Sequence, residues 1–237
     1  MKPEMNPNKI LVFTGAGISA ESGLQTFRDS DGLWNNFRVE DVATPEAWTI
    51  DPALVLQFYN DRRKEVFAAE PNAAHYAVAK LEEKYDVVVV TQNVDDLHER
   101  AGSTNVIHVH GQINYARSSS NDTLLYPLAE GAPIQLGDLC EEGSQLRPHI
   151  VWFGETIENY ELTRKHIIAA GKVLVVGSSL QVFPAAGILK KARYNAEKII
   201  VTQKLDHKPS GFKLLRGNAT SLVSSVANDW LNGNRVF

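Results

Sequence analysis

Residues 9–20 read Lys-Ile-Leu-Val-Phe-Thr-Gly-Ala-Gly-Ile-Ser-Ala, and this stretch decides the fold of the 237-residue chain. An apolar run ends here in a turn with the spacing G-x-G-x-x-A, from Gly15 to Ala20. Glycines at this spacing permit a tight turn and let the backbone approach a pyrophosphate, while the N-terminus of a following helix directs N–H groups at the anion. Alone the pattern is weak evidence, because a purely structural turn can share it. The acidic residue that a standard dehydrogenase carries about 20 positions later is not evident.

Three more apolar, β-branched runs follow the first. The four runs are Ile10 to Phe13, Val87 to Val90, Val173 to Val176 and Ile199 to Val201. The connections between them are long enough for crossover helices, so the pattern predicts an α/β fold, a Rossmann-like doubly wound parallel sheet with a smaller inserted domain. Ligands of such sheets lie beyond the carboxyl ends of the strands, where Gly15, Gln92 and Gly177 follow the first three runs.

Two segments interrupt the strand rhythm and define the inserted domain. We expect residues 31–79 and 117–146 to form it, and residues 1–30, 80–116 and 147–237 to form the Rossmann-like domain. The first insertion contains a predicted helix, because Asp51 is a suitable N-cap and Pro52 suits the first helical position. The second is rich in Ser, Asn, Asp, Gly and Glu and has no clear period.

The bulk composition excludes several classes of protein. A content of 43% hydrophobic and 22% charged residues is ordinary for a globular protein. The formal charge of -4 gives no footprint for nucleic acid or an anionic membrane, and the apolar runs are far shorter than the roughly 20 residues of a spanning helix. We therefore expect neither nucleic acid nor a membrane as partner. Cys140 is the single cysteine, which excludes an intrachain disulfide, and without a secretion signal in view we expect a cytoplasmic protein.

Longer motifs resemble the sirtuin family. The glycine-rich turn continues as Glu-Ser-Gly-Leu-Gln-Thr-Phe-Arg-Asp at residues 21–29, Thr-Gln-Asn-Val-Asp-Asp-Leu-His follows the second run at residues 91–98, and Val-His-Gly stands at residues 109–111. In physical terms, Arg28 could hold a phosphate with its planar fork, and Phe27 could shield a reacting ring from water. The alternative for these two is a buried phenylalanine and a surface arginine.

The resemblance implies an enzyme that removes acyl groups from lysine side chains with NAD as co-substrate. In that chemistry the acyl oxygen attacks the ribose carbon bearing nicotinamide, and His110 acts as general base on a ribose hydroxyl, with Asn93 as the second catalytic residue. Amides and carboxylates suit ribose hydroxyls and a carboxamide, and an imidazole titrates near neutral pH. The implied cofactor contacts are Gly15, Ala16, Gly17, Phe27, Arg28, Gln92, Asn93, Asp95, Gly177, Ser178 and Ser179. His98 and His108 could instead be packing histidines.

Two later segments carry further implied contacts. Arg-Pro-His-Ile-Val-Trp-Phe-Gly-Glu at residues 147–155 resembles the family segment that pairs its backbone with an extended substrate peptide, which implies substrate contacts at Val151, Phe153 and Gly154. The alternative is an apolar strand in the core. The stretch from Gly177 to Ala186 resembles the family's adenosine-side loop, whereas residues 202–204 depart from the family pattern, so the adenine-ribose contact stays unassigned.

Tyr59 and Arg62 bear on which acyl group is removed. Their spacing places both on one face of the predicted helix, where a phenol and a guanidinium could bind a carboxylate. The pair resembles the Tyr-x-x-Arg signature of sirtuins that accept succinyl-, malonyl- or glutaryl-lysine. We therefore expect a preference for acidic acyl groups, with weaker deacetylation. The alternative is an aromatic anchor beside a solvated arginine.

The chain departs from the family at the structural zinc site. Two Cys-x-x-Cys pairs bind zinc in most sirtuins, but Ser118 and Asn121 stand at the first pair, and Cys140 is the one thiol at the second. One cysteine cannot make a four-thiolate site, so we expect no metal.

Three functions remain open at this point. The leading one is the lysine deacylase, with acylated-lysine proteins as partners; the second transfers ADP-ribose to protein on the same fold. The third is a non-enzymatic NAD-binding sensor. The individual substrate proteins and the oligomeric state cannot be read from the sequence.

Overall fold

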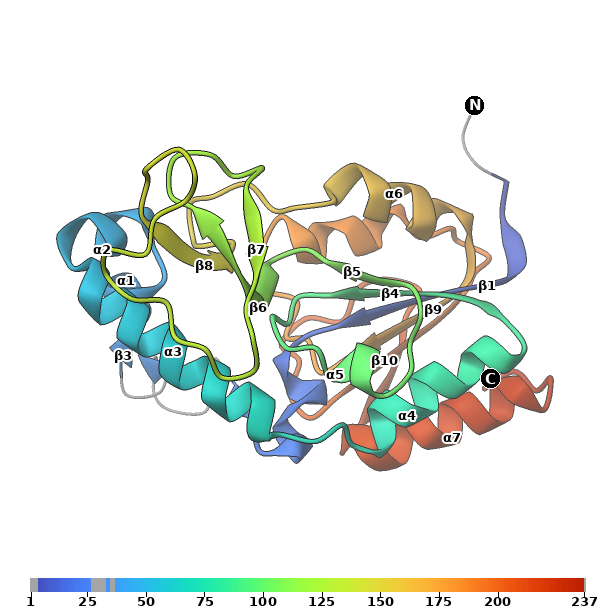
Figure 1. Cartoon of the computed structure of the whole chain (residues 1–237). Coiled ribbons are helices and arrows are strands. Elements are labelled where there is room, and N and C mark those ends of the chain that lie inside the picture. The colour runs from blue at the N-terminus through green and yellow to red at the C-terminus, as the bar shows by residue number, and fades with distance from the viewer. Residues whose placement is uncertain (1–3, 27–32, 35–36, 237) are drawn as a thin grey trace.

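A six-stranded parallel sheet forms the larger part of the computed structural model, which describes residues 4–26, 33–34 and 37–236 (Figure 1). Its strands, in spatial order, are β11 (Lys213–Arg216), β10 (Glu197–Thr202), β9 (Ala170–Val176), β1 (Asn6–Thr14), β4 (Asp86–Thr91) and β5 (Val106–His108). The four predicted strand runs lie in β1, β4, β9 and β10. The strand order reverses between β1 and β9, and this is the point where such sheets bind ligands.

Helices cover both faces of this sheet, as the doubly wound prediction requires. Along β1, Ile10 and Val12 pack toward α4 (Ala73–Lys80) and α7 (Ala219–Leu231), while Leu11 and Phe13 pack toward α6 (Tyr160–Ala169) and the 3₁₀ segment η4 (Ala185–Lys191). Figure 1 shows α4 and α7 side by side below the sheet and α6 above it. The alternation explains why the central strands are apolar on every residue: both faces are buried.

A smaller module lies beside the carboxyl edge of the sheet, at the left of Figure 1. Its helices are α1 (Val39–Val42), α2 (Pro45–Ile50) and α3 (Pro52–Ala68), and its strands are β2 (Leu33–Trp34), β3 (Phe37–Arg38), β6 (Gly111–Ser118), β7 (Leu125–Pro127) and β8 (Leu146–Ile150). The predicted start of α3 is confirmed, since the Asp51 carboxylate accepts a hydrogen bond of 2.9 Å from the Leu54 amide and Pro52 occupies the first turn.

The antiparallel sheet β7–β6–β8 is not predicted from the sequence. Strand β7 is only three residues long, and β8 contains Arg147, Pro148 and His149, which give it no alternating pattern. A strand in residues 147–155 is the alternative interpretation of that segment, but its pairing with β6 is not predicted. We propose the domain division at residues 1–30, 80–116 and 147–237 against 31–79 and 117–146. The antiparallel sheet crosses two of these boundaries, the one between residues 116 and 117 and the one between residues 146 and 147, because β6 begins at Gly111 and β8 ends at Ile150.

Short elements complete the described chain. They are the 3₁₀ turns η1 (Ala16–Ile18), η2 (Ala20–Ser22) and η3 (Leu81–Glu83) and the helix α5 (Leu97–Arg100). The described helices are all too short or too polar to traverse a lipid bilayer.

Candidate active site

A cavity of about 440 Å³ opens where the carboxyl edge of the parallel sheet meets the small module. Every site residue predicted from the sequence that the structure describes lines this cavity: Gly15, Ala16, Gly17, Tyr59, Arg62, Gln92, Asn93, Asp95, His110, Val151, Phe153, Gly154, Gly177, Ser178 and Ser179. Phe27 and Arg28 lie outside the described residues. Segments far apart in the sequence therefore converge on one site.

The floor of the cavity is a contact between two backbone turns. The Gly17 amide donates to the Gly177 carbonyl at 2.9 Å, and Gly177 adopts a left-handed φ of 62°. A Cβ atom on Gly17 would lie 2.7 Å from the Gly177 Cα, so no side chain fits between the turns. The motif predicts a helix directly after the turn. The chain instead forms the two short turns η1 and η2, which end at the left-handed Gly23.

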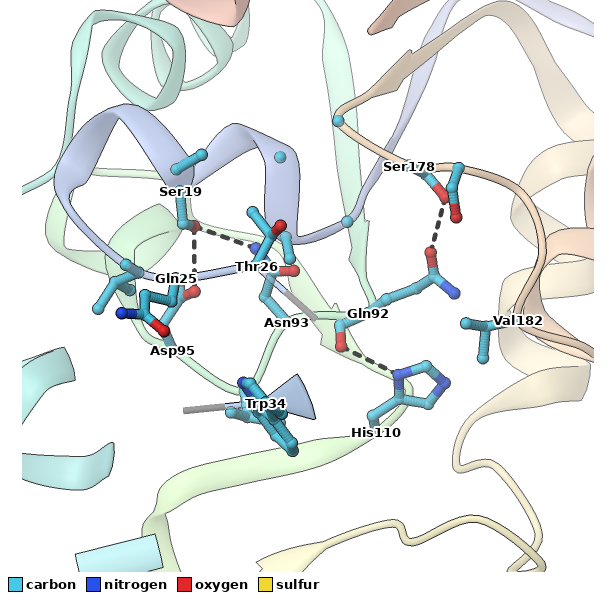
Figure 2. A pocket seen from close by; sticks show the side chains of 18 of the residues that line it. Ser19, Gln25, Thr26, Trp34, Gln92, Asn93, Asp95, His110, Ser178 and Val182 are labelled. Atoms are coloured by element: carbon cyan, nitrogen blue, oxygen red, sulfur yellow. Dashed lines mark hydrogen bonds between the residues drawn. The ribbon is translucent and has the colours of Figure 1, made fainter. Parts of the chain in front are cut away.

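His110 is held in one tautomer by the main chain. Its Nδ1 lies 3.0 Å from the Gln92 carbonyl oxygen. Figure 2 marks this hydrogen bond with a dashed line. Because a carbonyl only accepts, Nδ1 carries the proton and Nε2 keeps its lone pair. Burial lowers the pKa of His110 below its ordinary 6.5, so the ring is neutral at pH 7. A neutral imidazole with a free Nε2 lone pair is a competent general base.

A hydroxyl joins the amide and carboxylate groups at the back of the cavity. The Ser19 hydroxyl donates to the Asp95 carboxylate at 3.0 Å and accepts from the side-chain amide (Nδ2) of Asn93 at 3.1 Å (Figure 2). Burial raises the pKa of Asp95. On the opposite side Ser178 donates to the Gln92 side-chain oxygen at 2.9 Å. Ser19 is not among the site residues predicted from the sequence, although its hydroxyl lies within the G-x-G-x-x-A spacing.

The other two histidines near the motif do not line the cavity. His108 has both ring nitrogens engaged, one with Glu99 at 2.8 Å and one with the Asn93 carbonyl at 3.1 Å. His98 is buried, and its Nε2 lies 3.2 Å from the Thr14 hydroxyl. Both fit the packing role that the sequence left open for them.

Tyr59 and Arg62 present buried donors at the small-module side of the cavity. Tyr59 is 0% exposed and Arg62 is 6% exposed. Among the described residues, the Arg62 Nε has no hydrogen-bond partner, and the Tyr59 hydroxyl, which lies close to the Trp152 ring N–H, has no acceptor for its own proton. Burial raises the pKa of Tyr59 well above its ordinary value, so the phenol stays protonated. Two unsatisfied donors beside a cavity favour a ligand that brings acceptor oxygens.

The segment after β8 forms a wall whose amides are already engaged. The Val151 amide donates to the His110 carbonyl at 2.9 Å, and the Phe153 amide donates to the Ala43 carbonyl at 3.0 Å. Glu155 closes the turn by accepting from the Trp152 amide at 2.8 Å. A peptide that pairs with this wall would therefore use other backbone groups of the segment. Residues 202–204, which the sequence left unassigned, also line the cavity.

Ser118, Asn121 and Cys140, at the positions where the sequence resemblance would place zinc ligands, do not fit a zinc ion. Cys140 donates to the buried Ser118 hydroxyl at 3.4 Å, and the same hydroxyl accepts from the Asn121 amide at 3.2 Å. Hydrogen bonds between Ser118, Asn121 and Cys140 thus occupy the place where a zinc site would have metal–thiolate bonds. The part of the chain that the structure describes contains no group of three or more His, Cys, Asp or Glu side chains placed to hold a metal ion.

Comparison with known proteins places these features in one family. A model of the Sir2 family matches residues 15–184. A protein of Helicobacter pylori named NAD-dependent protein deacylase is 46% identical over 219 residues, covering 92% of this chain and 95% of the relative. A protein of Bacteroides thetaiotaomicron with the same name is 43% identical over 223 residues, with coverage of 92% and 95%.

Solved structures of Sir2 proteins also superpose on this chain over most of its length. A Sir2 homologue mutant in complex with ADP-ribose superposes with a TM-score of 0.85 at 37% identity, covering 95% of this chain and 92% of the other. A Sir2 homologue in complex with NAD gives a TM-score of 0.83 at 37% identity, with coverage of 95% and 90%. A complex of Sir2 with a p53 peptide and NAD+ gives 0.75 at 28% identity, with coverage of 94% and 93%.

Proposed function

The chain belongs to the Sir2, or sirtuin, family, and from that membership we propose that it is an NAD-dependent protein-lysine deacylase. We further propose that it prefers succinyl- and malonyl-type groups, removes acetyl groups more weakly, and releases nicotinamide and O-acyl-ADP-ribose. Its partners are acylated-lysine proteins, and the proposed compartment is the cytoplasm. The two relatives named NAD-dependent protein deacylase support this activity, because each aligns with the chain over 95% of its own length.

One observation supports the proposal: a single cavity is lined both by a general base and by two side chains with unsatisfied hydrogen-bond donors. His110 offers a free Nε2 lone pair, and Tyr59 and Arg62 offer buried donors without partners among the described residues. The base suits the activation of a hydroxyl, and the donors suit a carboxylate at the end of an acyl chain. A cavity for acetyl-lysine alone would leave these two donors unsatisfied.

The polar groups of the cavity fit NAD. When bound, NAD supplies a ribose carbon whose bond to nicotinamide can break. The close contact of Gly17 with Gly177 leaves the backbone bare for a pyrophosphate. Asn93 and Asp95, linked through Ser19, offer fixed polar groups for a carboxamide. His110 accepts a ribose hydroxyl proton at Nε2, while its Nδ1 keeps its own proton and donates it in a hydrogen bond to the Gln92 carbonyl.

Turnover of matched peptides tests this function directly. Succinyl-lysine and acetyl-lysine peptides of one sequence are incubated with and without NAD, and products are identified by mass spectrometry, with His110→Ala as control. NAD-dependent loss of succinyl with formation of O-succinyl-ADP-ribose is the expected result. Acetyl turnover alone would keep the deacylase and remove the acidic preference. ADP-ribose on protein would favour the transferase, and no NAD consumption would favour a sensor.

A further inference from the structure

The guanidinium of Arg62 already has an anionic partner from its own helix. Its Nη1 donates to the Glu65 carboxylate at 2.9 Å, three residues further along α3. Its Nη2 donates to the Gln25 carbonyl at 2.9 Å. The Arg62 side chain is 8% exposed and the Glu65 side chain 47% exposed, so Glu65 meets the buried cation from the solvent side. Arg62 lines the cavity.

We propose that Glu65 is a specificity-determining residue that weakens selection of acidic acyl groups by neutralising Arg62. The inference rests on the proposed deacylase function and concerns the same acyl site. A carboxylate that enters the cavity is attracted by Arg62 and repelled by Glu65, which already engages the same guanidinium. The net charge of the Arg62 and Glu65 side chains together is zero. In a partly buried setting the repulsion is screened far less than in water.

Arg62 does not depend on Glu65 for its position. The Gln25 carbonyl holds one end of the guanidinium, and the Trp34 ring lies 5.8 Å from its central carbon. The side chain is also packed on the buried face of α3, among the apolar residues of the small module. Removing the negative charge of Glu65 should therefore strengthen the attraction between Arg62 and an entering carboxylate, while the Arg62 side chain keeps its position.

The charge of Glu65 should alter the binding of charged acyl groups and leave the binding of neutral acyl groups unchanged. An acetyl group brings no charge, so the balance between Arg62 and Glu65 does not alter its binding. A succinyl group carries a carboxylate and gains whatever attraction Glu65 had cancelled. Glu65 thus sets the ratio of the two activities and leaves His110, which performs the proton transfer, untouched.

Glu65→Gln tests the inference, because glutamine keeps an acceptor for Arg62 and removes only the charge. We expect the ratio of kcat/KM for succinyl-lysine over acetyl-lysine peptides to rise roughly fivefold, in line with the coupling of partly exposed charges. Asp61→Asn is the matched control. It removes one negative charge from the same helix and an ion pair of the same i, i+3 spacing, with Lys64 at 3.0 Å. Neither Asp61 nor Lys64 lines the cavity, whereas Arg62, the partner of Glu65, does.

Every outcome decides the question. An unchanged or lower ratio in Glu65→Gln overturns the inference, as does an equal rise in Asp61→Asn, which would reveal a general charge effect. In Arg62→Met/Glu65→Gln the gain should vanish relative to Arg62→Met alone. Calorimetric binding of the succinyl-lysine peptide gives a readout independent of turnover. Tighter binding by Glu65→Gln without turnover by any variant would uphold the role of Glu65 and defeat the deacylase function.

Discussion

The Nδ1 atom of His110 lies 3.0 Å from the main-chain oxygen of Gln92, and this contact fixes which ring nitrogen can act as a base. Gln92 follows β4 and His110 precedes β6, so the tautomer is set by the joint between the parallel sheet and the small module. The Gln92 side chain is held in turn by Ser178, beyond β9. Gln92 thereby links His110, which precedes the small-module strand β6, to the loop that follows β9.

Replacing the base should remove turnover while leaving binding intact. His110→Asn is expected to lower kcat by about 10² to 10⁴, the usual contribution of a positioned general base. In the wild type, burial lowers the pKa of His110 below 6.5, so the inactive protonated form accumulates only at lower pH. The acid limb of kcat/KM should therefore fall below pH 6.5. A pH profile checks this, and an acid limb at or above pH 7 would contradict it.

The parallel sheet and the residues at its carboxyl edge could be predicted because the signals are local. Four β-branched runs predicted β1, β4, β9 and β10, and the glycine spacing predicted the turn after β1. The antiparallel sheet could not be predicted, since β8 carries buried polar residues whose partners lie elsewhere in the fold. Strands β5 and β11, three and four residues long, are too short to show a period.

The same distinction applies within the candidate site. Ser19 joins Asn93 and Asp95 across 74 and 76 residues of sequence, a relationship that no local pattern contains. The partnership of Arg62 with the Gln25 carbonyl is of the same kind. Motifs identify which residues gather at a site, but the hydrogen bonds that set tautomers and charge balance come from tertiary structure. That is where this chain can differ from its relatives.

Removing the cation of the acyl site should separate the two activities. Arg62→Met is expected to cost about 1.5 to 3 kcal/mol of succinyl-lysine binding, roughly one to two orders of magnitude in kcat/KM, because a charge-assisted hydrogen bond is lost. Acetyl-lysine turnover should change much less. Steady-state kinetics on both peptides measure the difference. Equal losses on both would show that Arg62 only supports the fold of α3.

The contact between the two glycine turns should tolerate no side chain. In Gly17→Ala the new Cβ would lie 2.7 Å from the Gly177 Cα, and backbone on both sides must move. We expect a loss of about 1 to 3 kcal/mol in the free energy of unfolding and no thermal stabilisation by NAD. Gly187→Ala is the control, because its Cβ would meet only the Phe183 ring at 3.4 Å. Thermal melts with and without NAD decide the matter, and an NAD shift retained by Gly17→Ala would refute it.

The small module should owe its local order to Ser118 and not to a metal. Ser118 is 1% exposed and accepts from the amides of Ser120 and Asn121, at 3.3 and 3.2 Å. Ser118→Ala leaves these amides without their acceptor and should cost about 1 to 3 kcal/mol, whereas exposed Ser221→Ala should cost little. A chelator should leave the melting temperature unchanged. Stoichiometric zinc by elemental analysis would contradict the prediction.

Acid should destabilise the fold through His75, which is fully buried in α4 with its ring 4.9 Å from that of His98. Burial lowers the pKa of His75 from 6.5 to about 4, so the unfolded chain binds its proton first as the pH falls. The contribution of the neutral His75 ring to the free energy of unfolding is therefore fully present above pH 6.5. It is lost between pH 6.5 and about 4, and the loss is about 3 kcal/mol. His75→Gln keeps an acceptor for the Asn72 amide in the capping box but cannot titrate. Urea unfolding at pH 7 and pH 4.5 should show a smaller acid loss in His75→Gln than in the wild type; parallel losses would exclude His75 as the cause.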